Sequence, residues 1–397
     1  MSTAAQRSPL VNAHIHLPPN FSAFTTVEDA IECARAEGIS VLGASNYYDF
    51  TVYREFDRRA EVAGIHPLHG LEIIALDPTL QAAGVKVNDP GNPGRFYLCG
   101  KAIVRHDPLD PAAADDIAWI RRSDTARMEA MAARMDDACR AAGHPVGLDA
   151  DAIRRDVAAE AGADPGTVVL QERHVARAFE RALRRAVPEE RFAEALSAVC
   201  GAPVAATDPA GAQNALRSHL MKAGKPAYVE EKFVDFDTAV RIVLALGGIP
   251  SYPTLVDGAN PICPFEADLD ALVAELKARG IHAAELIPIR NSPEVLSRTV
   301  KAFRSAGMIV TAGTEHNTPD RLPVAPRCVG GAPIPGEINA IFLEGARVLV
   351  GHSERVRRGG DGYVLRDGTP NPEWPDAESR IAALAALGEA VLAGRVA

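Results

Sequence analysis

Short apolar segments alternate with amphipathic segments along much of this 397-residue chain. The apolar segments fit β-strands, and the amphipathic ones repeat their hydrophobic residues about every 3.6 positions, as α-helices do. Strands joined by helices through short links lie parallel and are connected by right-handed crossovers. The predicted strands are residues 10–16, 40–45, 65–75, 95–104, 247–252, 283–288 and 308–314, and the helices between them are residues 26–37, 50–63, 237–246, 269–280 and 293–307. This alternation predicts an α/β fold with seven strand–helix units around one axis.

A helical segment interrupts the alternation between residues 107 and 235. It is rich in alanine and arginine, and its hydrophobic periodicity predicts helices at residues 117–143, 174–186, 189–200 and 213–223. We interpret it as a helical insertion that caps a discontinuous barrel made of residues 1–106 and 236–330. The tail, residues 331–397, is expected to pack on the barrel through helices at residues 336–350 and 375–392.

The composition argues against nucleic-acid binding and against a membrane span. A net charge of −10 lacks the cationic footprint of sequence-independent nucleic-acid binding, although it leaves room for a local basic pocket that holds an anion. No apolar run approaches the roughly 18–20 residues that span a bilayer, and the six cysteines are scattered without a CxxC pair. We therefore expect a cytoplasmic protein with reduced thiols and no membrane partner, whose oligomeric state is open.

The first predicted strand ends in His14-Ile15-His16. Residues i and i+2 of a strand point to the same face, so both imidazoles project together and can share a divalent metal ion. The spacing alone does not separate a metal pair from a packing coincidence. In a parallel barrel, however, the chemistry collects at the carboxyl ends of the strands. Those ends also carry Asn46, Glu72, Tyr97, Tyr252, Glu285 and the run Thr314-Glu315-His316.

On these motifs the chain resembles the PHP family, the polymerase and histidinol phosphatase superfamily of metal-dependent phosphoesterases. The family's His-x-His, Gly-hydrophobic-Glu and closing Gly-Ser-Asp-x-His motifs are matched by residues 14–16, 70–72 and 312–316, and its Gly-Gly strand by residues 238–253. The resemblance implies a distorted seven-stranded, TIM-like (β/α) barrel. It also implies a metal site built from His14, His16, Glu72 and His316, which Glu315 could join.

Several positions depart from the family pattern. The second motif, usually Thr-Asp-His, is Ser45-Asn46-Tyr47 here, and two positions that usually hold a ligand histidine are Tyr97 and Tyr252. The aspartate of the last motif is Thr314. These changes leave ligands for one or two ions, and a trinuclear centre is not expected. A site of carboxylates and imidazoles accepts zinc, manganese or iron.

The predicted substrate-binding residues are Asn46, Tyr252, Arg290, Arg173 and His174. Arg290 follows the strand at residues 283–288 and would offset negative charge at the barrel mouth. Arg173-His174 is similar to an Arg-Pro-His segment found in the inserted helices of some PHP phosphoesterases. A tyrosine hydroxyl at a lost ligand position, as at Tyr252, can donate a hydrogen bond to substrate.

The function predicted from these residues is that of a metal-dependent hydrolase that acts on a small phosphorylated molecule. A bound ion would activate a water, Glu72 could bridge two ions, and Glu315 or His316 would transfer protons. One alternative is the same barrel acting on an amide, a lactone or a sugar acid, since fewer metal ligands suit phosphate chemistry less well. The other is a barrel that binds a metal or ligand without catalysis.

Overall fold

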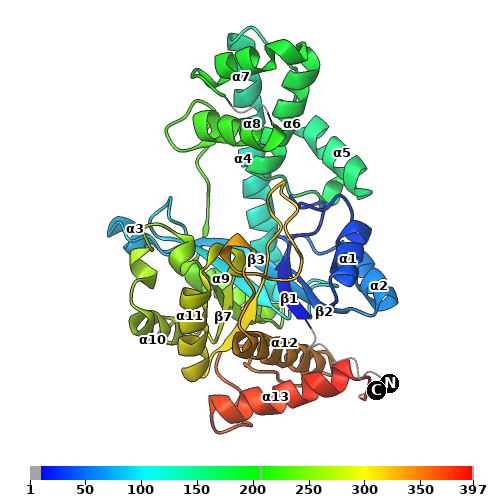
Figure 1. Ribbon diagram of the computed structural model, residues 1–397, viewed down its shortest axis with the longest axis vertical. Helices are drawn as coiled ribbons and strands as arrows, with labels where there is room; N and C mark the ends of the chain where they lie inside the picture. Colours follow the sequence, from blue (N-terminus) through cyan, green and yellow to red (C-terminus); the bar gives the residue numbers. More distant parts are fainter. Residues whose placement is uncertain (1–9, 206–207, 396–397) are drawn as a thin grey trace.

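The computed structural model describes residues 10–205 and 208–395 of the chain (Figure 1). Seven strands form one nearly closed barrel in the order β1-β2-β3-β4-β6-β7-β8. Their bounds are β1 Leu10–Ile15, β2 Ile39–Ala44, β3 His66–Leu76, β4 Arg95–Lys101, β6 Ile249–Thr254, β7 Ala283–Leu286 and β8 Ile309–Ala312. A two-residue strand, β5 Val234–Asp235, pairs with β3 outside this path. The predicted α/β barrel of seven strands is therefore confirmed.

The barrel closes where β1 meets the segment that follows β8. The amide of His16 donates to the carbonyl of Glu315 at 2.8 Å, and the amides of Thr314 and Glu315 donate to the carbonyl of His14 at 3.0 and 2.9 Å. Ile15 and Glu315 form a single parallel β-bridge at this seam. The closure therefore brings the two ends of the barrel sequence to one place.

Strand β4 runs antiparallel to both of its neighbours, β3 and β6, which corrects the prediction of an entirely parallel barrel. A parallel return needs a crossover, usually a helix that spans the length of the strand. The link between β3 and β4 holds only the five-residue helix α3 Pro78–Ala82. Because β4 is reversed, its first residues lie where the parallel strands end, with Tyr97 opposite Ile74 and Cys99 opposite Glu72.

Helices cover the outside of the barrel as predicted. Their bounds are α1 Val27–Ala36, α2 Tyr53–Ala63, α9 Phe236–Ala245, α10 Leu269–Ala278 and α11 Pro293–Ser305. Side chains just before four of them accept hydrogen bonds from the first free amides: Thr26 at α1, Asp235 at α9, Asp268 at α10 and Ser292 at α11. Short helical turns complete the connections: η1 Pro165–Thr167, η2 Glu189–Arg191, η4 Val256–Gly258, η5 Pro264–Glu266, η6 Pro288–Arg290 and η7 Val329–Gly331.

The inserted segment forms a helical cap that stands above the barrel in Figure 1. Its helices are α4 Pro111–Ala141, α5 Ala150–Ala161, α6 Glu172–Ala186, α7 Phe192–Cys200 and α8 Pro209–Leu216, followed by the π-helical turn η3 Arg217–Met221. Helix α5 was not predicted, and α4 begins earlier than predicted because Asp110 caps it and Pro111 occupies its first position.

Helix α4 links the cap to the barrel. Its 31 residues extend about 46 Å at about 1.5 Å per residue. Near its start, Ile117 and Ile120 belong to the hydrophobic core of the barrel. Further along, Met131 and Met135 belong to a separate core inside the cap. One continuous helix therefore positions the cap residues over the barrel mouth.

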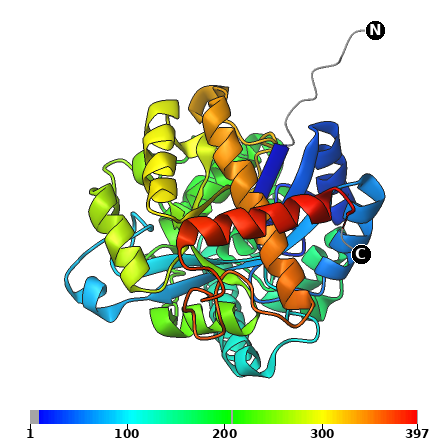
Figure 2. The ribbon, with the colours of Figure 1, turned by 90° about the horizontal axis from the view of Figure 1, so that it is seen from below.

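The tail forms two helices, α12 Gly336–Arg357 and α13 Ala377–Leu392, at the end of the barrel opposite the cap (Figures 1 and 2). Helix α12 continues beyond the predicted end at residue 350. Gly351, in this added part, allows close contact with α13: a Cβ there would lie 2.1 Å from the carbonyl oxygen of Leu384. At Gly388 of α13, a Cβ would lie 1.9 Å from the carbonyl oxygen of Arg347. Among the described residues, no helix combines the length and apolar character that crossing a membrane requires.

Candidate metal centre

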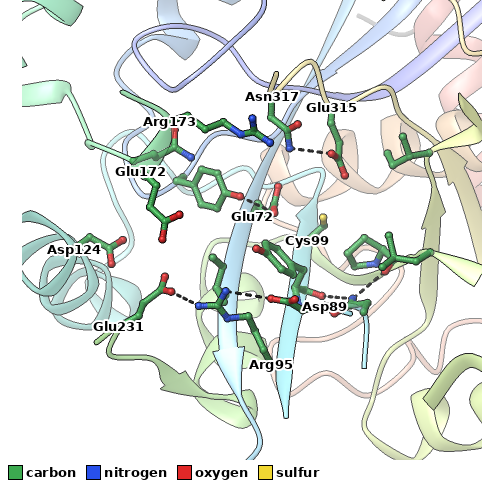
Figure 3. A pocket seen from close by; sticks show the side chains of 18 of the residues that line it. Glu72, Asp89, Arg95, Cys99, Asp124, Glu172, Arg173, Glu231, Glu315 and Asn317 are labelled. Carbon is green, nitrogen blue, oxygen red and sulfur yellow. Dashed lines mark hydrogen bonds and ion pairs between the residues drawn. The ribbon is translucent and has the colours of Figure 1, made fainter. Parts of the chain in front are cut away.

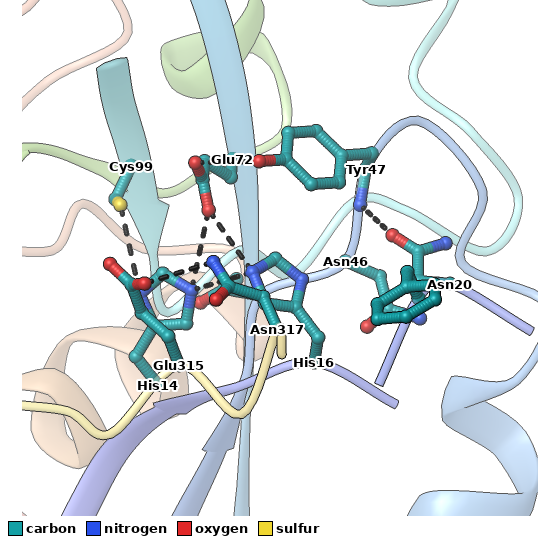
Figure 4. A network of polar contacts seen from close by, with 12 residues as sticks. His14, His16, Asn20, Asn46, Tyr47, Glu72, Cys99, Glu315 and Asn317 are labelled. Atoms are coloured by element: carbon teal, nitrogen blue, oxygen red, sulfur yellow. Dashed lines mark hydrogen bonds and ion pairs between the residues drawn. The ribbon is translucent and has the colours of Figure 1, made fainter. Parts of the chain in front are cut away.

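His14, His16 and Glu72 meet inside the barrel. His14 lies in β1, His16 follows that strand, and Glu72 lies in β3. The Nε2 atoms of the two histidines are 3.3 Å apart, and Glu72 Oε2 is 3.5 Å from Nε2 of His14 and 3.2 Å from Nε2 of His16 (Figure 4). All three side chains are buried. We refer to these three residues as the triad.

The triad has the spacing of ligands that share one ion. Two atoms held about 2.1 Å from the same ion are about 3.0 Å apart at an octahedral angle and about 3.4 Å apart at a tetrahedral one. The observed separations of 3.2, 3.3 and 3.5 Å match this range. Glu72 Oε2 is buried and forms no hydrogen bond with another described residue. Two imidazoles and one carboxylate, with a buried oxygen left to be neutralised, therefore fit a divalent metal ion.

Neighbouring side chains hold each member of the triad in place. His14 Nδ1 lies 2.6 Å from Oε1 of Glu285, a fully buried carboxylate in β7. The ring of His16 stacks on Tyr47 with centroids 5.2 Å apart and planes at 9°. The Tyr47 hydroxyl donates to Glu72 Oε1 at 2.7 Å. Such outer contacts fix the orientation and tautomer of metal ligands.

Burial and neighbouring charges set the protonation of these groups. Burial acts to raise the pKa of Glu72, but the imidazoles of His14 and His16 hold that pKa well below its usual value. Burial, together with the charge of Glu72, raises the pKa of Tyr47 well above its usual value. Burial also raises the pKa of the Cys99 thiol to about 11. At neutral pH the carboxylate is therefore ionised, and the tyrosine is a hydrogen-bond donor.

The segment after β8 has an unusual backbone. Glu315 and His316 have φ values of 57° and 54°, a region that residues other than glycine seldom adopt and that often marks functional sites. Both ring nitrogens of His316 are engaged: Nδ1 lies 2.8 Å from Thr314 Oγ1, and Nε2 lies 2.9 Å from the carbonyl oxygen of Leu322. The structure does not bring His316 into the triad, and we leave it out of the proposed ligand and proton-transfer sets.

Glu315 lies at the pocket beside the triad, but its carboxylate is paired with Arg290. One contact, from Arg290 Nη1 to Glu315 Oε1, is 3.0 Å long, and a second from Nη2 is shorter. Asn317 also donates to Glu315 Oε2 at 2.9 Å. The carboxylate of Glu315 raises the pKa of Arg290 above its usual value. The structure thus brings together Glu315 and Arg290, for which the sequence predicted separate roles, and the pairing leaves Glu315 outside the triad.

A pocket of about 430 Å³ lies between the triad and the cap (Figure 3). Residues of β3, β4, α4 and α6 line it. Its volume suits a small molecule. The charged lining residues are the cations Arg95, Arg127, Arg173, Arg217, Lys222 and Arg290 and the carboxylates Glu72, Asp89, Asp124, Glu172, Glu231 and Glu315. Most of these charges are paired, as Arg127 with Glu172 at 2.5 Å.

Two of the lining charges, Arg173 and Asp124, form no ion pair or hydrogen bond with another described side chain. Burial and the nearby charge of Arg217 lower the pKa of Arg173 to about 10. Burial and the charge of Glu231 raise the pKa of Asp124 to about 7. Figure 3 shows Arg173 extending from the cap toward Asn317, across the pocket. Both groups are therefore available to a bound ligand.

Three residues predicted to bind substrate lie outside this pocket. The side chain of Asn46 is fully buried and exchanges hydrogen bonds of 2.8 Å with the backbone of Leu17. The Tyr252 hydroxyl donates to Glu266 at 2.8 Å, within the wall of the barrel. His174 accepts from the amide of Gln171 at 3.1 Å, at the start of α6. The three side chains share one feature: each polar group is used to fix local backbone or side-chain structure.

Several residues that the structure places at the site had no predicted role. Glu285 stood at a predicted strand end, which could have identified it as a partner of His14. Cys99, Asn317 and Asp124 carried no signal, because the reversed strand, the last loop and the cap helix bring them to the site only in the folded chain.

The comparisons with known proteins identify the fold. No protein-family model matches the chain, and no curated protein matches it in sequence. In structure it is similar to a protein from Bifidobacterium adolescentis assigned as a metal-dependent phosphoesterase, with a TM-score of 0.55 and 16% identity over 85% of this chain and 96% of that one. A weaker match, with a TM-score of 0.49, is to an amidohydrolase from Chromobacterium violaceum with bound sulfate and no metal, 18% identical over 83% of this chain and 96% of that one. The first of these matches supports the barrel architecture.

Proposed function

We propose that this protein is a metal-dependent hydrolase of small phosphate esters, in which His14, His16 and Glu72 hold a divalent ion. The observation that carries the proposal is the spacing of the three ligand atoms, 3.2–3.5 Å, inside a buried site at the floor of a pocket. The motifs shared with the PHP family favour the same activity, and the barrel is of the kind found in the Bifidobacterium protein.

The residues around the triad prepare it for this chemistry. Glu285 holds His14 so that its Nε2 atom faces His16 and Glu72, and Tyr47 holds both the ring of His16 and one oxygen of Glu72. The chemistry that a bound divalent ion supplies here is Lewis acidity and the activation of water. Because these side chains are already ordered, little reorganisation is needed when the ligand binds.

Two cationic groups at the pocket support the proposal of an anionic substrate. Arg290 is held at the mouth by Glu315, and Arg173 reaches the pocket from α6 with its guanidinium unpaired. A guanidinium matches the oxygens of a phosphate with two parallel hydrogen bonds. We propose that Arg173 binds the phosphate and that Arg290 offsets the charge that develops on it. In this arrangement Glu315 positions Arg290.

Metal analysis tests the ligand assignment. We expect the purified protein to retain a divalent ion, and the double variant His16→Ala/Glu72→Ala to lose it, because only one imidazole of the triad remains. The double variant His144→Ala/Glu61→Ala, which changes the same residue types away from the pocket, is the matched control. Retention of the full metal content by His16→Ala/Glu72→Ala would disprove the assignment.

A substrate panel tests the reaction class. Phosphomonoesters and phosphodiesters are compared with amides and lactones, each in the presence of Zn²⁺, Mn²⁺ or Fe²⁺. We expect phosphate release that depends on the triad and falls in Arg173→Met. Turnover of amides or lactones without phosphate release under any of these metals would instead indicate that the barrel acts on a non-phosphate substrate.

A further inference from the structure

The ring of His14 lies between two sets of metal-ligand side chains. Its Nε2 atom faces His16 and Glu72, which complete the triad. Its Nδ1 atom faces Cys99 and Glu285, and these three residues also place one ligand atom each within 4.8 Å of one another. His14, Cys99 and Glu285 are 1, 0 and 0% exposed. If both sets were filled, the centre would hold two ions.

Distances distinguish the two sets. Ligands of a shared ion are about 3.0–3.4 Å apart, as in the triad. In the second set, however, His14 Nδ1 and Glu285 Oε1 are 2.6 Å apart, which is the length of a direct hydrogen bond. The Cys99 thiol is 3.8 Å from Glu285 Oε1 and 3.9 Å from His14 Nδ1. An ion could enter this set only by displacing the bond between His14 and Glu285.

A lysine already supplies a positive charge to this second set. Lys101, the last residue of β4, is 2% exposed, and its Nζ atom is 2.5 Å from Glu285 Oε2. The same Nζ lies 3.1 Å from the carbonyl oxygen of Ala13 and 3.4 Å from Ser45 Oγ. The ammonium is thus surrounded by three oxygens, as a small bound cation would be. Lys101 and Cys99 point to the same face because they are two residues apart in a strand.

Glu285 has a cationic partner in this enclosed region without a second ion. The carboxylate of Glu285 carries one negative charge, and the Lys101 ammonium carries one positive charge at contact distance. A divalent ion placed beside Cys99 would be repelled by the ammonium, and in a buried site little solvent screens that repulsion. A buried lysine is itself tolerated because it is paired and hydrogen-bonded.

We propose that Lys101 is the built-in second cation of this centre: its ammonium takes the place at Glu285 that a second metal ion would occupy, so that the centre holds one divalent ion. The proposal rests on the proposed function, because it assumes that the triad binds metal. It further assigns to Lys101 a positioning role, since the ammonium holds Glu285 and through it the ring of His14.

Titration with Co²⁺ tests the proposal. We expect the full-length protein to bind one ion in the pocket without a sulfur-to-cobalt charge-transfer band, because Cys99 is not a ligand. In Lys101→Met the Glu285 carboxylate is left unneutralised, and we expect a second ion together with such a band, since thiolates are soft ligands. The band should disappear in Lys101→Met/Cys99→Ser. Lys301→Met, which removes an exposed lysine on α11, is the matched control and should bind one ion.

The number of bound ions and the presence of the thiolate band decide whether Lys101 takes the place of a second metal ion. Binding of two ions by the unaltered protein, with a thiolate band that Cys99→Ser removes, would overturn the proposal whether or not Lys101→Met folds. Binding of a single ion by a folded Lys101→Met protein would also overturn it. Failure of both the unaltered protein and Lys101→Met to bind any ion would overturn the proposed function itself, and not only the role of Lys101.

Discussion

Removal of the Tyr47 hydroxyl is the sharpest test of how the triad is held. In Tyr47→Phe the ring remains stacked on His16, while the 2.7 Å hydrogen bond to Glu72 Oε1 is lost. Tyr47 and Glu72 are 8 and 5% exposed, so water has little access to replace the missing donor. The carboxylate of Glu72 then becomes free to rotate away from the two imidazoles, and it must be ordered again when a metal ion binds.

The expected loss of metal affinity follows from the type of hydrogen bond that is removed. A hydrogen bond to a charged group contributes about 1.5–3 kcal/mol. At about 1.4 kcal/mol for each tenfold change, this corresponds to a metal dissociation constant that is about 10–100-fold higher, as is typical when an outer partner of a ligand is removed. Competition with a chromophoric chelator at fixed pH measures the constant directly.

The neighbouring residue provides the control. The Tyr48 hydroxyl accepts a hydrogen bond of 3.3 Å from the amide of Ile74 and does not contact the triad. Tyr48→Phe should therefore leave the metal affinity within about twofold, even where it lowers stability by about 1 kcal/mol. An unchanged metal affinity in Tyr47→Phe, or an equal loss in Tyr48→Phe, would refute the reasoning.

Three further predictions concern the cap, the tail and the substrate. Folding raises the pKa of Asp124 from 3.8 to about 7, mainly through burial, so the ionised carboxylate destabilises the fold increasingly from about pH 4 to pH 7 and fully above it. Asp124→Asn should therefore increase the free energy of unfolding by about 1–2 kcal/mol at pH 8 and by little at pH 4 in urea titrations, and a pH-independent difference would contradict this. Gly388→Ala should destabilise the protein by about 1–3 kcal/mol in thermal unfolding, because its Cβ would meet the backbone of α12, whereas Gly336→Ala, with open space around it, should be neutral or stabilising. Arg173→Met should raise KM for a phosphate ester about 10–100-fold without loss of metal, while Arg185→Met on the exposed side of α6 should have no effect; equal KM values would exclude a role for Arg173 in binding.

Most of the barrel could be predicted because local hydrophobic periodicity identifies its strands and helices. Each of the seven strands overlaps its predicted range, and the five barrel helices begin and end within a few residues of theirs. The direction of β4 could not be predicted in this way. Periodicity identifies a strand but not its orientation, which depends here on the short helix α3 and on pairing with β3 and β6.

The site was predicted only in part for a related reason. His14 and His16 were predicted in one strand, and Glu72 stands between apolar residues of another, so each carried a local signal. His316 carried a similar signal, but its two nitrogens bond to Thr314 and to the backbone of Leu322. The hydrogen-bond partner of a polar side chain cannot be predicted from a local pattern, because the possible partners are distant in sequence and meet only in the folded chain.

Local sequence properties dictate the alternation of strands and helices, the apolar faces that pack together, and the histidine pair at the end of β1. These features follow from neighbouring residues through hydrophobic period, helix capping and the two-residue repeat of a strand. The folded chain alone shows that β4 is reversed, that Lys101 and Glu285 lie behind His14, and that the cap brings Arg173 and Asp124 to the pocket. The partner of each charged group depends on contacts between residues distant in sequence, and the strength of each pairing depends on burial. Both exist only once the chain has folded.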